Sequence, residues 1–206
     1  MLCGENLSYE INDTIIIKDL HLAVNPGEVL YIEGDNGAGK TILLRILCGI
    51  VQPDYGKVLW NNETITDNMT HYCSNLTYIG HLPGVKHELT ALENLQFLSS
   101  LSGLPPKTDY LEALEWAGLA GFEHNLAGYL SYGQQRRLTL ARLKVESSQV
   151  WILDEPFSGL DQPMIETLKI LFLEHLSGSG MLLLTSHQPI DLAEMKSSRL
   201  VLESFD

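Results

Sequence analysis

Short apolar runs separated by turn residues dominate the first sixty positions of the chain. Residues 14–17 are β-branched and residues 29–33 are mostly apolar, and the turn-forming run Asn-Pro-Gly-Glu at 25–28 lies between them. Runs of this length, bounded by glycine and proline, predict strands. A further run at 57–60 follows the turn residues 53–56 and predicts an edge strand.

One helix is expected among these strands. Residues 41–49 carry leucines at helical spacing and end in glycine, directly after the strand at 29–33 and a glycine-rich loop at 34–40. The local order is therefore strand, loop, helix.

The middle of the chain has a helical pattern. Apolar residues recur at helical spacing within 89–98 and 110–118, and the breaker run Gly-Leu-Pro-Pro at 103–106 separates the two segments. We expect a helical insertion over about residues 85–141. Two continuous apolar runs, 150–153 and 181–184, then predict strands that are buried on both faces of a parallel sheet.

This alternation of strands and helices predicts an α/β fold of the P-loop NTPase type. A chain of 206 residues with 45% hydrophobic residues can bury one sizeable core, so a single domain over residues 1–206 is expected.

Composition and charge narrow the possible partners. The chain has 13 basic and 26 acidic residues and a net charge of -13, which repels phosphate backbones and argues against nucleic acid as a partner. Three cysteines without C-x-x-C spacing predict neither a disulfide framework nor a zinc site, and they suit a reducing, cytosolic compartment. No apolar run reaches the roughly 18 residues of a membrane-spanning helix, and no secretory signal is apparent. Work at a membrane would therefore require a recruiting partner.

Residues 34–41, Gly-Asp-Asn-Gly-Ala-Gly-Lys-Thr, fit the phosphate-binding pattern G-x-x-x-x-G-K-[ST]. Its glycines permit a tight loop whose backbone N–H groups face the β- and γ-phosphates of a nucleoside triphosphate, and the helix that follows presents its N-terminus to the same anions. The Thr41 hydroxyl is placed to coordinate Mg²⁺. A flexible surface turn is the other interpretation, but it does not explain the strand–loop–helix context. The expected nucleotide-binding residues are Asn36, Gly37, Ala38, Gly39, Lys40 and Thr41.

Two carboxylates, Asp154 and Glu155, follow the apolar run at 150–153. We assign Asp154 to the metal, through water, and Glu155 to polarising the attacking water. The alternative is a pair of capping acids before Pro156, and the phosphate loop favours the catalytic interpretation.

Residues 130–135, Leu-Ser-Tyr-Gly-Gln-Gln, resemble the LSGGQ signature of ATP-binding-cassette ATPases, with Tyr132 as the one departure in the first five positions. The resemblance implies a core with an N-terminal antiparallel β subdomain and an inserted helical subdomain. It also implies a homodimer in the presence of ATP, in which Ser131, Gly133 and Gln134 of one copy grip the γ-phosphate bound to the other. A serine–glycine turn that merely caps a helix is the alternative.

Other landmarks of this family follow in order. Residues 158–161 resemble the D-loop, which implies that Asp161 crosses the dimer interface, and His187 resembles the switch histidine that contacts the γ-phosphate. Tyr9 lies where the family commonly has an aromatic platform for adenine. A satisfied polar histidine and a core tyrosine are the alternatives. His81 stands where the family usually has a glutamine that ligates Mg²⁺ and senses the membrane partner.

A narrower resemblance is carried by the runs 80–86, 89–95, 117–123, 134–137 and 185–189. These runs resemble the haem-exporter branch, the cytochrome c maturation ATPases. The resemblance implies an ATPase (ATP-driven translocase) on the cytoplasmic face of the bacterial inner membrane, held there by an integral membrane permease. Its role would be haem export, or release of a haem chaperone, during c-type cytochrome biogenesis.

Two other classes remain open. The first is a cassette ATPase without a permease, acting for example in iron–sulfur cluster assembly. Such a protein would not co-purify with a membrane subunit, whereas a transport ATPase would. A P-loop kinase or GTPase would lack the signature at Ser131 and would not dimerise on ATP.

Overall fold

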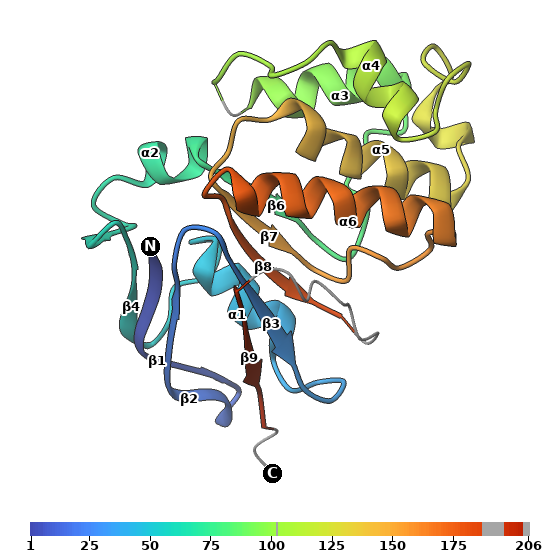
Figure 1. The fold of residues 1–206 in the computed structure, drawn as a ribbon. Coiled ribbons are helices and arrows are strands. Elements are labelled where there is room, and N and C mark those ends of the chain that lie inside the picture. The colour runs from blue at the N-terminus through green and yellow to red at the C-terminus, as the bar shows by residue number, and fades with distance from the viewer. Residues whose placement is uncertain (102, 187–195, 204–206) are drawn as a thin grey trace.

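The computed structural model describes residues 1–101, 103–186 and 196–203, which form two sheets and six α-helices (Figure 1). The antiparallel sheet has the strand order β2-β1-β4-β5 and the parallel sheet has the order β6-β7-β8-β3-β9. The strands are β1 (Leu2–Ile11), β2 (Thr14–Val24), β3 (Glu28–Glu33), β4 (Tyr55–Trp60), β5 (Glu63–Thr64), β6 (Leu76–Ile79), β7 (Val150–Leu153), β8 (Met181–Thr185) and β9 (Lys196–Val201). The helices are α1 (Lys40–Leu47), α2 (Met69–Ser74), α3 (Ala91–Ser100), α4 (Tyr110–Trp116), α5 (Tyr132–Val145) and α6 (Gln162–Ser177), with a short 3-10 turn at Ala127–Tyr129.

Most predicted elements are present, with one correction. The prediction of an edge strand at 57–60 is wrong, because β4 pairs with β1 on one side and with β5 on the other. The partner β5 has only two residues, too few to produce a strand signal in the sequence. Strand β2 has 11 residues and extends well beyond the predicted run at 14–17.

Helix α1 lies between the two sheets. Its buried side chains Leu43, Leu44, Ile46 and Leu47 share one hydrophobic core with the antiparallel sheet and one face of the parallel sheet. The opposite face of the parallel sheet is covered by α6 and part of α5 (Figure 1). All four residues of β7 are buried, as a strand covered on both faces requires.

Helix α5 belongs to two hydrophobic cores at once. Leu138, Ala141 and Val145 pack with α3 and α4 in the helical insertion, whereas Leu140 and Leu143 pack against the parallel sheet. The helix therefore joins the insertion directly to the sheet, and it continues to Val145 beyond the expected end of the insertion near residue 141.

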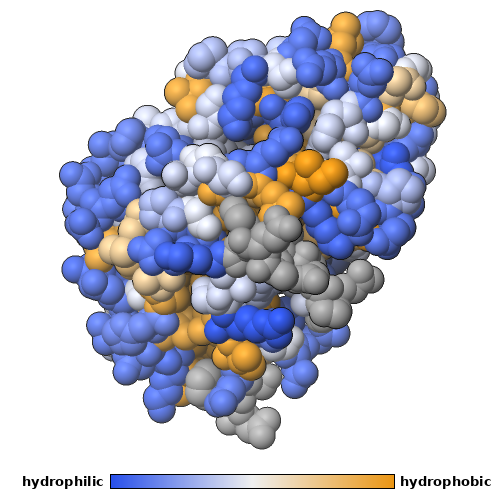
Figure 2. Space-filling view, in the orientation of Figure 1, coloured by the Kyte–Doolittle hydropathy of each residue, from blue (hydrophilic) through white to orange (hydrophobic). Residues whose placement is uncertain are grey.

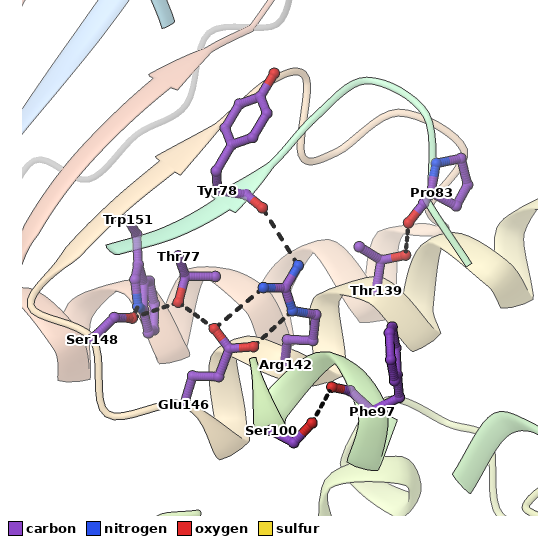
Figure 3. A network of polar contacts seen from close by, with 10 residues as sticks. All are labelled: Thr77, Tyr78, Pro83, Phe97, Ser100, Thr139, Arg142, Glu146, Ser148 and Trp151. Carbon is purple, nitrogen blue, oxygen red and sulfur yellow. Dashed lines mark hydrogen bonds and ion pairs between the residues drawn. The ribbon is translucent and has the colours of Figure 1, made fainter. Parts of the chain in front are cut away.

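Polar contacts fix the second half of α5 to β6 (Figure 3). The carboxylate of Glu146 accepts hydrogen bonds from Thr77 Oγ1 at 2.6 Å and from Arg142 Nε at 2.7 Å. Thr139 Oγ1 donates to the carbonyl of Pro83 at 2.6 Å. Glu146 and Thr77 are buried, and buried polar groups need hydrogen-bond partners. The network therefore holds the helix in a defined position on the sheet edge.

Among the described residues, no helix is both long and apolar enough to cross a membrane. The face shown in Figure 2 is largely hydrophilic, with small hydrophobic patches near the centre and others toward the top and in the lower part.

One core histidine predicts a pH-dependent stability. His175 stacks on Trp151 with ring centroids 3.6 Å apart, and burial lowers the pKa of His175 to about 4. The unfolded state, with a pKa near 6.5, therefore binds more protons between about pH 4 and 6.5. We expect the free energy of unfolding to decrease by up to about 3 kcal/mol as the pH falls through this window. Urea unfolding of wild type and His175→Phe at pH 4.5 and 7 measures it.

The phenylalanine variant retains a ring against Trp151 but cannot be protonated, so its stability should vary less with pH than that of the wild type. Equal pH dependence in both proteins would show that His175 does not contribute.

Candidate nucleotide-binding site

The loop between β3 and α1 depends on glycine. Gly34, Gly37 and Gly39 have φ angles of 145°, 92° and 90°, which side chains with a Cβ rarely adopt. A Cβ on Gly39 would also lie 2.6 Å from Ile16 Cγ2, on the neighbouring strand β2. Gly39 is the N-cap of α1, so the loop leads directly into the helix. The backbone N–H groups of a helix N-terminus suit an anion.

Lys40 and Thr41 begin α1 and reach different parts of the site. Lys40 Nζ donates to the carbonyls of Gly34 at 2.6 Å and Asp35 at 2.9 Å, so the ammonium lies across the loop. Thr41 Oγ1 donates to Asp154 Oδ2 at 2.8 Å, although the two residues lie 113 positions apart. A hydroxyl and a carboxylate side by side are the hard oxygen donors that Mg²⁺ prefers.

Thr185 fixes the two carboxylate residues. Its Oγ1 donates to Asp154 Oδ1 at 2.7 Å and accepts a hydrogen bond from the backbone N–H of Glu155 at 2.9 Å. No role for Thr185 was predicted from the sequence. The available signal was its place directly after four buried apolar residues, at the same sheet edge as Asp154.

An open cavity of about 330 Å³ joins these elements. It brings together most of the predicted phosphate and metal residues with Glu155, whose backbone is left-handed at φ 50°. Ala38 is buried instead of lining the cavity. The lining residues are Asn36, Gly37, Gly39, Lys40, Thr41, Ile42, His81, Asp154 and Glu155.

Tyr9 lies on β1, opposite Ile17 of β2, and packs partly buried against the core. The preceding residue of β2, Ile16, approaches the phosphate loop at Gly39. Tyr9 is therefore close to the loop in the fold, but its side chain does not line the 330 Å³ cavity. His187 lies outside the described residues.

The signature segment forms the start of α5. The Ser131 hydroxyl accepts a hydrogen bond from the Gln134 N–H, and the Gln134 side chain accepts one from the Ser131 N–H, which is a capping box. A Cβ on Gly133 would lie 3.1 Å from the Gly159 carbonyl, and Arg137 forms an ion pair with Asp161 at 2.6 Å. The signature and the 158–161 segment are thus neighbours, where α5 and α6 both begin (Figure 1).

Ser131 is exposed and does not line the cavity that contains Lys40. Within one chain, the structure therefore brings the phosphate loop to Asp154 and Glu155, but it does not bring the signature to them.

A second groove of about 310 Å³ adjoins the cavity on the side of the helical insertion. His81, Thr41 and Asp154 line both the cavity and the groove. Two exposed leucines lie on or near this side: Leu82 lines the groove and is 73% exposed, and Leu101, which lines an adjoining depression, is 68% exposed.

Comparison with known proteins agrees with this geometry. The family model described as ABC transporter matches residues 17–158. The chain is 45% identical to the cytochrome c biogenesis ATP-binding export protein CcmA of Haemophilus influenzae, over 95% of this chain and 93% of that protein. It is 43% identical to the proteins of the same name from Aliivibrio fischeri, covering 97% and 99%, and Escherichia coli K12, covering 98% and 96%.

Two solved structures show the same fold. An ATP-binding subunit of an ABC transporter superposes with a TM-score of 0.86 at 24% identity, covering 98% of this chain and 85% of the other. The ATP-binding cassette MJ0796, in a dimeric post-hydrolysis state with ADP and Pi, superposes with a TM-score of 0.81 at 22% identity, covering 91% and 88%.

The family match defines an ATPase of the ABC transporter class, and the shared fold confirms the predicted P-loop fold. Within that class, the chain belongs to the family of the CcmA cytochrome c biogenesis ATP-binding export proteins.

Proposed function

We propose that this chain is the ATP-hydrolysing subunit of an export complex in c-type cytochrome biogenesis, and that the complex exports haem or releases a haem-loaded chaperone. The observation that carries the proposal is identity of 43% to 45% along nearly the full length of the CcmA proteins. The phosphate cavity supports the ATPase part independently of that likeness.

The triphosphate would be held by the loop before α1. Loop residues and Lys40 line the space in which the β- and γ-phosphates would lie. Backbone N–H groups and an ammonium in such a place suit these anions. Thr41 and Asp154 would hold Mg²⁺, because their oxygen atoms already lie 2.8 Å apart at the edge of this space. The metal would neutralise phosphate charge. Tyr9 would stack on adenine, next to the loop.

Glu155 would act as the general base. It lines the same cavity, and the contact of its N–H with Thr185 orients its backbone. A carboxylate so placed can take a proton from the water that attacks the γ-phosphate. His81, which lines both the cavity and the adjoining groove, and His187 would report the state of the γ-phosphate.

Two copies would close on two ATP molecules. Ser131 is exposed at the N-terminus of α5, away from the Lys40 cavity of its own chain, so a phosphate can contact both only across a two-fold interface. Gly133, Gln134 and Asp161 lie on the same exposed end of the molecule and would join the interface. ATP would favour the closed dimer far more than ADP does, which is the condition for ATP to drive movement.

The permease would dock on the groove that adjoins the cavity, in the region from residue 81 to 95. Exposed Leu82 in the groove and exposed Leu101 beside it offer apolar contacts. His81 lines both the groove and the nucleotide cavity and so connects them. Such docking would hold the chain on the cytoplasmic face of the inner membrane.

Affinity purification from detergent-solubilised membranes tests this assignment. We expect the tagged full-length chain to carry integral membrane subunits, identified by mass spectrometry. Leu82→Asp and Leu101→Asp should each lose those subunits, whereas Tyr55→Asp, which is 74% exposed on β4, should retain them. Recovery of only water-soluble iron–sulfur assembly proteins would instead favour the cassette ATPase without a permease.

A further inference from the structure

Arg136 is the fifth residue of α5, and its side chain is completely buried. Its guanidinium donates to four backbone carbonyls. Nη1 donates to Gly80 at 2.7 Å and His81 at 3.4 Å, and Nη2 donates to Asp154 at 2.8 Å and Glu155 at 2.7 Å. One side chain therefore joins the ends of two adjacent strands, β6 and β7, to the signature helix.

The backbone at Glu155 needs such support. Its φ of 50° is in the left-handed region, which a residue with a side chain adopts only when its surroundings impose it. Thr185 fixes the N–H of Glu155 and Arg136 fixes its carbonyl. The direction of the Glu155 side chain therefore depends on both contacts.

The same helix carries Ser131 at its N-cap, five residues before Arg136. Five residues of α-helix span about 7.5 Å, and a helix moves as a rigid unit over that length. A displacement of Ser131 would thus move the guanidinium on which the Glu155 carbonyl rests.

We propose that Arg136 is a positioning residue for ATP hydrolysis, which links the docking of the signature helix to the backbone of Glu155 and of the loop at His81. The proposal rests on the roles proposed above for Glu155 and Ser131, but not on the identity of the cargo. Glu155 would point correctly at the attacking water only when α5 is seated on the sheet.

A guanidinium suits this position better than any other side chain. Burial lowers the pKa of Arg136, and the nearby carboxylates of Asp154 and Glu155 oppose that shift, so the group remains a cation. Its planar fork reaches two pairs of carbonyls at once. A lysine ammonium is a single point charge and cannot reproduce that geometry.

Substitution of Arg136 should not detach α5. The Arg142–Glu146–Thr77 contacts and the Thr139–Pro83 hydrogen bond still fasten the helix to β6 and to the loop after it (Figure 3).

The first test is Arg136→Lys in the full-length chain. We expect kcat for ATP to fall about tenfold with KM little changed, because a small displacement of a catalytic group lowers the rate without removing phosphate contacts. Lys144→Met is the control on the same helix, because the Lys144 ammonium lies 4.0 Å from the Glu174 carboxylate of α6 and Lys144 has no proposed role in the site. That variant should keep wild-type kcat. The proposal is overturned if Arg136→Lys has an unchanged kcat, or if only KM changes.

The second test is a double-mutant cycle with Glu155→Gln, measured by single-turnover hydrolysis. If Arg136 acts through Glu155, Arg136→Lys should change the rate of the Glu155→Gln protein by less than about twofold. A full tenfold loss in that background would instead indicate general damage and would overturn the proposal. Near-normal hydrolysis by Glu155→Gln alone would remove the proposed base, and with it the role of Arg136.

Discussion

Replacement of Glu155 with glutamine is expected to lower kcat for ATP by about 100- to 1000-fold and to leave ATP affinity close to wild type. Glutamine has nearly the same shape as glutamate but cannot accept the proton of the attacking water. The backbone contacts of this position, to Thr185 and Arg136, do not involve the changed atoms. Lys40, Thr41 and Asp154 retain their geometry, so nucleotide binding should persist.

The same variant should accumulate as an ATP-bound dimer, because closure no longer leads to hydrolysis and reopening. Steady-state ATPase assays and gel filtration with and without ATP measure both effects. Glu166→Gln, an exposed change on α6, is the matched control and should resemble wild type in both assays. Near-normal turnover by Glu155→Gln would exclude it as the base. Failure to dimerise with ATP would contradict the mechanism in which two copies close on ATP.

Elements with a strong local signal could be predicted from the sequence. The runs at 150–153 and 181–184 are strands because continuous apolar residues suit the centre of a parallel sheet. Helix α1 was indicated by its leucine spacing. The edge position assigned to 57–60 failed because a strand's neighbours depend on the rest of the fold, and no periodicity within the run reveals them.

Helix α6 was not predicted, although the sequence contains features typical of a helix in this segment. Pro163 lies near its start and Gly178 follows its end, the usual asymmetry of helix termini. Its apolar residues at 168, 171 and 172 have helical spacing and cover the parallel sheet.

The candidate site divides in the same way. Residues whose chemistry belongs to a contiguous motif, such as Lys40, Thr41 and Asp154, could be found from the sequence, and the structure brings them together. Thr185 and Arg136 could not be assigned roles, because they act on backbone atoms of Glu155 that are distant in sequence. The sequence did indicate that Arg136 could be buried, because it lies four residues before Leu140 and so on the same helix face. Both residues are buried in the structure.

Ser131→Arg is expected to abolish the ATP-dependent dimer and to lower kcat by more than about 100-fold, while a single chain still binds ATP. The reason is geometric. Ser131 lies outside the Lys40 cavity of its own chain, so a bulky cation there leaves that phosphate loop intact. At a two-fold interface, the same side chain would displace the backbone N–H groups at the start of α5 from the γ-phosphate of the second copy.

Gel filtration of Ser131→Arg in the Glu155→Gln background, with ATP, measures the dimer directly, and titration with a fluorescent ATP analogue measures binding. The substitution also removes a helix cap, which costs about 1 kcal/mol of stability. Thr90→Ala is the matched control, because Thr90 forms the equivalent capping box on α3. Thr90→Ala in the Glu155→Gln background should still dimerise. A stable ATP-bound dimer of the Ser131→Arg protein would mean that the signature does not meet the nucleotide across the interface, and the two-copy mechanism would then lack its structural basis.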